Sequence, residues 1–188
     1  MRDQHRLSTP EQFSLLCEYA RMGQCETMIE LIEEAPEIVK YHDQTGMTPM
    51  MYAAQEGTFD AAVILHKHGG NLTEFSDEGL SAVHYAARRE TPELLVYFFN
   101  TCDISVDIHD RYGSTPIVNA VGFNRLAVVK YLCEDAKCQT DGIHVGGALR
   151  MDLINWAAYS QEMGRCTPRE DAANAVYYYL EEFLGKSA

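Results

Sequence analysis

Three similar segments decide the fold of this chain: TPMMYAAQEG at residues 48–57, SAVHYAARRE at residues 81–90 and TPIVNAVGFN at residues 115–124. They begin 33 and 34 residues apart. An apolar stretch with helical spacing follows each of them, at residues 59–69, 93–100 and 126–132. Self-similarity with a period of this size is typical of repeat proteins. We therefore expect stacked units, each built from a loop and two helices.

The first residues of each segment suit the start of a helix. Thr48 and Thr115 are good N-cap residues, and Pro49 and Pro116 then occupy the first helical position, where a missing N–H costs nothing. Ser81 can also act as an N-cap, although an alanine follows it. The sequence therefore predicts that a helix starts directly after each of these three residues.

Small residues recur around these starts. A glycine stands two positions before each segment, at Gly46, Gly79 and Gly113, and it permits a turn with a positive φ. The alanine pairs at 53–54 and 86–87 allow neighbouring helices to approach closely. Each unit is thus predicted to begin with a tight turn and to pack its first helix closely.

The period and the start of each segment resemble the ankyrin repeat, a β-turn plus two helices with a T-P-L-H-x-A signature. The tetratricopeptide repeat has a similar period, but its W…L-G…Y pattern is missing here. Degenerate copies at 14–24 and 152–161 extend the pattern to both ends. The resemblance implies an all-α ankyrin solenoid. It would form one domain over residues 1–188, with repeats at 9–45, 46–78, 79–112, 113–141 and 142–188.

No arrangement of residues in the sequence indicates catalysis. His84 is the one match to the signature histidine, and the resemblance gives it a structural role. Cys133 and Cys138 lack histidines at zinc-finger spacing, so we expect buried thiols. Neither a phosphate-binding loop nor a nucleophile elbow occurs, and the loop at 139–150 reads as a glycine-rich connection. We predict no catalytic residue, no metal and no cofactor.

The charge of the chain restricts its partners. There are 28 acidic and 15 basic side chains, giving a formal net charge of -13, which repels nucleic-acid phosphates and anionic membranes. No run approaches the roughly 18 apolar residues of a membrane span, and the N-terminus lacks the apolar region of a secretory signal. The six cysteines form no disulfide framework. We expect a cytoplasmic or nuclear protein that is monomeric on its own.

The resemblance also implies where a partner binds. Ankyrin proteins use an extended concave surface, formed by the turn tips and the exposed side of each first helix. Arginine and aromatic residues, which are enriched at binding hot spots, occupy the central positions of that surface and favour a peptide with acidic and apolar residues. The predicted partner-binding residues are Met47, Gln55, Glu56, Leu80, Arg88, Arg89, Arg111, Tyr112 and Phe123.

Several alternatives remain open. Arg88 and Arg89 could instead pair with Glu56, Asp77 or Glu78. The main hypothesis is a non-catalytic protein-interaction module whose partner is a protein or peptide. In the alternative, acidic helix faces shield a basic client protein, as an inhibitor or chaperone would. A third hypothesis is a regulatory subunit of an enzyme. Near the C-terminus, Trp156 is predicted to be core, and the tyrosine run at 177–179 to leave one ring exposed.

Overall fold

The computed structural model describes residues 9–141, 144–145, 149–150, 152–164 and 170–185. The chain forms two compact units, residues 1–85 and 86–188, and the boundary falls inside helix α5 (Ala82–Ala87). The first of the two units begins with two helix pairs. The second contains the remaining helices and one short hairpin.

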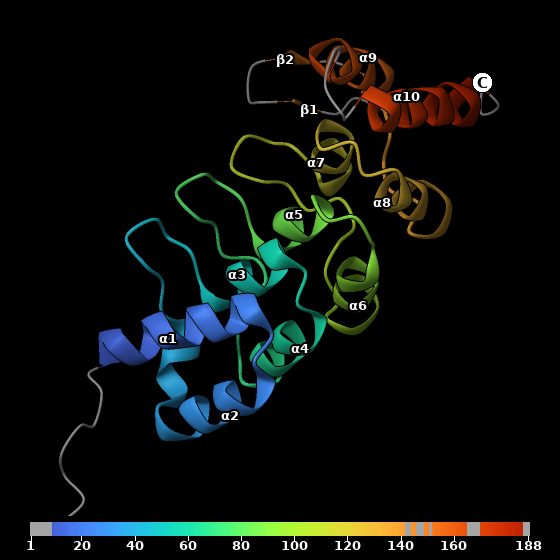
Figure 1. Cartoon of the computed structure of the whole chain (residues 1–188). Helices are drawn as coiled ribbons and strands as arrows, with labels where there is room; N and C mark the ends of the chain where they lie inside the picture. The colour runs from blue at the N-terminus through green and yellow to red at the C-terminus, as the bar shows by residue number, and fades with distance from the viewer. Residues whose placement is uncertain (1–8, 142–143, 146–148, 151, 165–169, 186–188) are drawn as a thin grey trace, which may run out of the picture. The chain divides into compact units, whose positions relative to one another are not determined.

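In the first unit, each pair consists of a first helix and a second helix that packs against it. The first helices α1 and α3 contact each other, and the second helices α2 and α4 form a neighbouring layer. The loops that precede α3 and α5 extend to the same side (Figure 1). The elements are α1 (Thr9–Met22), α2 (Cys25–Glu34), a 3-10 turn (Pro36–Lys40), α3 (Pro49–Glu56) and α4 (Phe59–Lys67).

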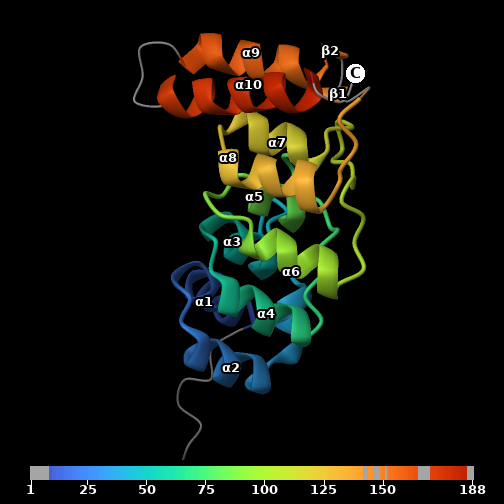
Figure 2. The ribbon, with the colours of Figure 1, turned by 90° about the vertical axis from the view of Figure 1, so that its right-hand side faces the viewer.

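The second unit contains further helix pairs, and its last described helix ends at Gly185. Helix α9 packs on α7 and lies beside α10 (Figure 2). The elements are α6 (Glu93–Thr101), α7 (Pro116–Gly122), α8 (Leu126–Lys130) with a π-helical turn (Tyr131–Asp135), β1 (His144–Val145), β2 (Leu149–Arg150), α9 (Leu153–Gly164) and α10 (Glu170–Gly185). This is the all-α ankyrin architecture expected from the sequence.

The glycine-rich stretch after α8 contains a detail that its composition did not indicate. Strands β1 and β2 pair antiparallel, with Val145 opposite Leu149 and His144 opposite Arg150. Two pairs of described residues take part in this hairpin. Gly142, Gly146 and Gly147 lie outside the described residues.

The turn before each first helix repeats the same hydrogen bonds. In the turn 43–47, the Asp43 N–H donates to the Met47 carbonyl, and the Gly46 N–H donates to the Asp43 carbonyl. The turns 76–80 and 110–114 show the same two bonds. Gly46, Gly79 and Gly113 have φ values of 72°, 79° and 81°, so the predicted positive φ is confirmed. The period in the sequence thus reflects one turn geometry used three times.

The three predicted N-caps differ in how they bond. Thr48 accepts a hydrogen bond from the Met51 N–H at 3.3 Å, which confirms its capping role. The Ser81 hydroxyl instead lies 2.8 Å from Nδ1 of His84, and its backbone N–H also points to that nitrogen. Thr115 holds the N-cap position, but its buried hydroxyl has no partner among the described residues. Thr115 therefore stands at the predicted N-cap position, but without a capping hydrogen bond to its side chain.

Hydrogen bonds also tie one helix pair to the next within each unit. The Thr58 hydroxyl donates to the carbonyl of Ala20 at 2.6 Å. Arg125, which occupies the corresponding position of a later repeat, donates from Nε to the Arg88 carbonyl at 2.7 Å. Each bond satisfies a carbonyl near the end of a preceding first helix, where helices leave their last carbonyls unpaired.

The remaining sequence expectations have mixed outcomes. Cys133 and Cys138 are buried as predicted, and Tyr178 exposes 61% of its surface. Trp156 is only half-buried rather than core, because its ring covers Gly122 at the surface and its Nε1–H bonds the Val118 carbonyl. Within the described ranges, every helix is too short or too polar to traverse a lipid bilayer.

Candidate binding surface on the first helices

One face of helix α1 borders two adjoining hollows in the first unit. The α1 residues that line them stand at positions 10, 13, 14, 17, 18, 21 and 22, which is the spacing of a single helical stripe. Tyr52 of α3 lines both hollows. One hollow, of about 570 Å³, ends at Glu56, and the other, of about 670 Å³, extends to the loop at 42–45. We call these two hollows together the N-terminal hollow.

The floor of the N-terminal hollow is held by a hydrogen-bond network around Asp43. Its Oδ1 accepts from the Thr45 N–H at 2.8 Å, the Thr45 hydroxyl at 2.7 Å and the Met47 N–H at 3.0 Å. Its Oδ2 accepts from the Tyr52 hydroxyl. Burial by itself raises the pKa of this carboxyl, but the bonds from Tyr52, Thr45 and Met47 outweigh it and lower the pKa. Asp43 therefore fixes both the turn and the Tyr52 ring as an anion.

Burial also keeps two neighbouring groups, the Cys17 thiol and the Tyr52 hydroxyl, protonated and unreactive. Desolvation and the Asp43 charge raise the pKa of the Cys17 thiol to about 12, so it is neutral at physiological pH. Burial, together with the bond to Asp43, raises the pKa of Tyr52 as well. A neutral thiol is a poor nucleophile. The N-terminal hollow thus offers shape, apolar surface and charge for binding.

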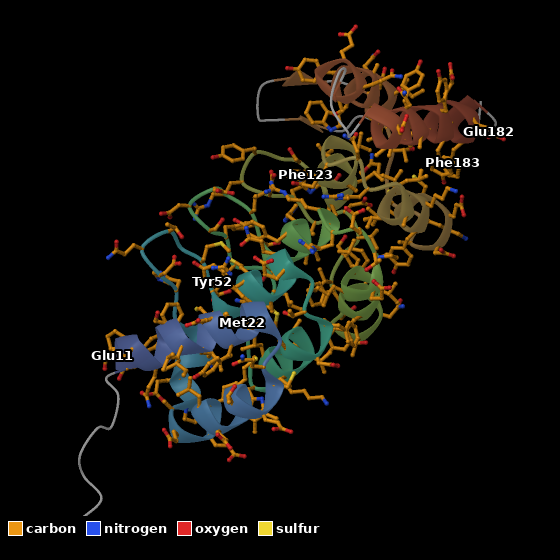
Figure 3. The ribbon with its side chains drawn as sticks, in the orientation of Figure 1. Glu11, Met22, Tyr52, Phe123, Glu182 and Phe183 are labelled. Atoms are coloured by element: carbon orange, nitrogen blue, oxygen red, sulfur yellow. The ribbon has the colours of Figure 1, made fainter. Side chains whose placement is uncertain are left out.

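Arg21 is the cation of the N-terminal hollow. Its guanidinium lies 5.6 Å from the centre of the Tyr52 ring, and its Nη2 lies 3.4 Å from Oε1 of Glu56. The Arg21 and Glu56 side chains are 55% and 37% exposed, so water screens the pair and it is weak. In Figure 3, Tyr52 lies beside helix α1, whose two ends carry Glu11 and Met22. Met22 exposes 61% of its surface next to this cation.

In the second unit, two of the predicted residues come together. The Arg88 guanidinium lies 4.6 Å from the centre of the Phe123 ring, and its Nε donates to Oδ1 of Asn119 at 2.9 Å. Phe123 remains 39% exposed (Figure 3). Tyr159 stacks on Trp156 at 5.7 Å and is also exposed. These four side chains, Arg88, Phe123, Trp156 and Tyr159, form what we call the aromatic ridge.

Two of the predicted binding residues are not available at the surface. Met47 and Leu80 expose only 7% and 5% of their surfaces, so their assignment to the turn tips is wrong. Each stands immediately before the N-cap of a first helix. An apolar side chain at that position commonly packs onto the helix that follows. The turn tips instead expose the residues two and three positions earlier, such as Gln44 and Thr45.

The other predicted residues lie where a partner can reach them. Gln55, Arg111 and Tyr112 are exposed, and Glu56 and Arg89 are half-buried. Tyr112 stands on the turn 110–114, where its N–H donates to Asp110. Whether these residues contact a partner stays a prediction.

Sequence reasoning missed most of the α1 stripe. Of this stripe, the ankyrin resemblance places only Arg21 and Met22 on the concave side, and neither is among the predicted partner-binding residues, because the repeat signature is degenerate in this part of the chain. Stepping back from that pair by three and four residues reaches Glu18 and Cys17, and then Ser14. The helical period was therefore a usable signal for the stripe. The contribution of the loop at 42–45 required the structure.

The residues singled out for possible chemistry are structural. His84 is fully buried, and because the Ser81 N–H can only donate, Nδ1 of His84 acts as an acceptor. The five cysteines in the described part of the chain are free thiols. Across these same described segments, His, Cys, Asp and Glu side chains nowhere gather in a group of three that could hold a metal ion.

Comparison with known proteins agrees with this architecture. The family described as ankyrin repeats, in three copies, matches residues 70–143. The match covers the central and later turns and their helices, where the repeat signature is clearest. Residues 70–143 are therefore identified as ankyrin repeats, which serve in general as protein-interaction modules.

A relative with a known name is similar over part of the chain. The liver isoform of mitochondrial glutaminase from Mus musculus is 28% identical over 83 residues. These residues are 44% of this chain and 14% of the mouse protein. Since the chain spans about one seventh of that relative, the similarity extends to a segment and not to the whole enzyme.

Proposed function

We propose that this chain is a non-catalytic interaction module that binds an extended protein segment on its first helices. The observation that carries the proposal is the N-terminal hollow, whose described lining residues all belong to the first helices α1 and α3 or to the loop before α3. This is the surface that the ankyrin resemblance assigns to partners. Its two parts, of about 570 and 670 Å³, lie within the size range of protein sites that enclose a ligand.

The exposed groups of the hollow suit a protein segment better than a small metabolite. Tyr52 and Arg21 are residue types enriched at interface hot spots. Met22 adds a flexible apolar side chain that can adapt to a partner's surface. The hollow also runs along a helix rather than closing around one point. In the second unit, the aromatic ridge supplies further residues of the same types, and we propose it as a second contact surface.

A substitution that fills the hollow tests the proposal. Ser14 is exposed and lines both parts of the N-terminal hollow, so Ser14→Trp places an indole in the space. Peptides selected by the full chain from a random dodecamer library would be measured against the wild type, Ser14→Trp and Glu30→Trp. Glu30 is exposed on α2, so Glu30→Trp is the matched control.

We expect the selected peptides to lose binding to Ser14→Trp and to keep it with Glu30→Trp. Circular dichroism of the two variants checks that both are folded. The proposal fails if the peptides bind Ser14→Trp normally and Glu30→Trp poorly, because the binding surface would then lie on the second helices.

A second candidate function has one observation in its favour. Residues 1–85 contain 14 acidic and 5 basic side chains, whereas residues 86–188 contain 14 and 10. The acidic excess is thus concentrated in the first unit, where α2 exposes Glu26, Glu30, Glu33 and Glu34. Such a face could shield a basic client. Binding that weakens steeply with salt and is lost in the double variant Glu30→Gln/Glu33→Gln would favour this function over the first.

A further inference from the structure

The charges that line the N-terminal hollow are unbalanced. Three carboxylates, Glu18, Asp43 and Glu56, face one guanidinium, that of Arg21. Asp43 is occupied by its four hydrogen bonds. Glu18 is exposed, and its carboxylate makes no hydrogen bond or ion pair with another described residue. Within the described residues, the Glu18 carboxylate of the hollow is therefore left without a cation.

Arg21, the one arginine or lysine among the described residues that line the hollow, is held only weakly. Arg21 contacts the Tyr52 ring at 5.6 Å and Glu56 at 3.4 Å, and more than half of its side chain is in water. Both contacts are of the kind that a partner's guanidinium would make with the same groups. The guanidinium of Arg21 thus stands where the cation of a bound segment would stand, and it can leave at small cost.

The opposite end of the hollow carries two apolar residues beside the polar loop at 42–45. Pro10 and Phe13 line it, and the Phe13 ring lies 6.4 Å from that of Tyr41, which is exposed. Along α1, Phe13 and Arg21 are separated by about 12 Å, at 1.5 Å per residue. An extended chain covers this distance in about four residues. The two ends of the hollow are therefore spaced for side chains at positions i and i+4 of an extended segment.

From these observations we infer that the N-terminal hollow binds a protein segment carrying an arginine and, four residues away, an apolar residue. The arginine displaces Arg21 from the Tyr52 ring and Glu56 and also meets Glu18, while the apolar residue packs against Phe13. Arg21 is then an internal competitor that lowers the affinity for the partner. The inference rests on the proposed function, and it replaces the acidic peptide expected from the central arginines with a basic one at this site.

The test uses the full chain and two fluorescent peptides in an anisotropy titration at low salt. One is Leu-Ser-Ser-Ser-Arg with blocked ends, and the other carries citrulline, the uncharged counterpart of arginine, at the last position. Arg21→Gln removes the internal competitor, and Lys67→Gln, on the exposed end of α4, is its charge-matched control. We expect Arg21→Gln to tighten binding of the arginine peptide by about threefold to tenfold, because one exposed ion pair and one exposed cation–π contact no longer compete.

A second pair of variants tests the carboxylates. Glu18→Gln/Glu56→Gln should weaken the arginine peptide to the level of the citrulline peptide, whereas Glu30→Gln/Glu33→Gln, with the same change of charge on α2, should cause a smaller loss. The inference is overturned if the arginine peptide does not bind, if Arg21→Gln leaves its affinity unchanged or lowers it, or if the two double variants behave alike. If library peptides still lose binding to Ser14→Trp in that case, the proposed function stands and only the partner chemistry is wrong.

Discussion

Replacing Gly46 by alanine tests whether the repeating turn holds the first unit together. Gly46 has a φ of 72°, a left-handed conformation that costs a residue with a Cβ about 1–2 kcal/mol. The Cβ of an alanine would also lie 3.0 Å from the Asp77 nitrogen and 3.2 Å from the Ser76 Cα. These are backbone atoms, so the turn 76–80 must shift, and the 2.9 Å bond from the Asp77 N–H to the Thr45 carbonyl is strained.

Gly23 provides the matched control for this substitution. It has nearly the same φ, 69°, but a Cβ there would meet only the Thr58 side chain, at 3.5 Å. Both variants therefore pay the same cost for an alanine with a positive φ, and both gain equally from the lower conformational entropy of the unfolded chain. The difference is the strained hydrogen bond between the turns, about 1 kcal/mol. Gly46→Ala should consequently be about 1 kcal/mol less stable than Gly23→Ala.

Urea unfolding of the full chain, followed by far-ultraviolet circular dichroism, measures this difference. With a slope of about 1–3 kcal/mol per molar urea, the midpoint of Gly46→Ala should lie roughly 0.3–1 M below that of Gly23→Ala. Tryptophan fluorescence serves as an internal reference, because the single tryptophan, Trp156, belongs to the second unit. Equal midpoints for the two variants would refute the idea that adjoining turns stabilise each other.

Three further predictions concern charge, packing and the second unit. Since the folded pKa of Asp43 is lowered, its carboxylate stabilises the fold above the unfolded pKa of about 3.9 and loses this effect as the pH falls through the folded value. Asp43→Asn should therefore lower the urea midpoint at neutral pH, and the difference between the variant and the wild type should be smaller at about pH 3. An equal difference at the two pH values would contradict this. Gly122→Val should displace the indole of Trp156, which lies 3.0 Å from the Cβ position, and shift its fluorescence to the red. Unchanged emission would show that the indole does not pack against Gly122. The double variant Arg88→Glu/Arg111→Glu should bind a natural partner captured by the wild-type chain more weakly. Normal binding by this variant would show that the second unit does not contribute to the contact with that partner.

Much of the fold could be predicted because its signals are local. The period of 33 and 34 residues, the threonines before proline and the glycines with positive φ each depend on only a few neighbouring residues. The hydrogen bonds of Asp43 and Asp110 inside their turns could have been added, because Asp–x–x–Gly recurs in the sequence. At Thr115 the N-cap position was predicted, but its buried hydroxyl has no hydrogen-bond partner among the described residues.

The candidate site was harder to predict because it depends on packing between repeats. Met47 and Leu80 were placed at the turn tips although each stands immediately before an N-cap, where an apolar side chain commonly packs onto the helix that follows. Arg88 contacts Phe123 and also Asn119, which lies 31 residues further along the chain. These contacts depend on how α7 packs. The N-terminal hollow lay in the most degenerate repeat, where the family signature is weakest. The hollow is formed jointly by α1, α3 and the loop before α3, so it can be seen only once these elements are packed together.

The most direct test of the account is hydrogen–deuterium exchange of the full chain with and without a peptide selected from the random library. The account predicts slower exchange in residues 9–22 and 41–56, which contain α1, the loop and α3. It also predicts little change in α2 and α4. Protection confined to α2 and α4, with unchanged exchange in α1 and α3, would contradict the claim that this protein binds its partner on its first helices.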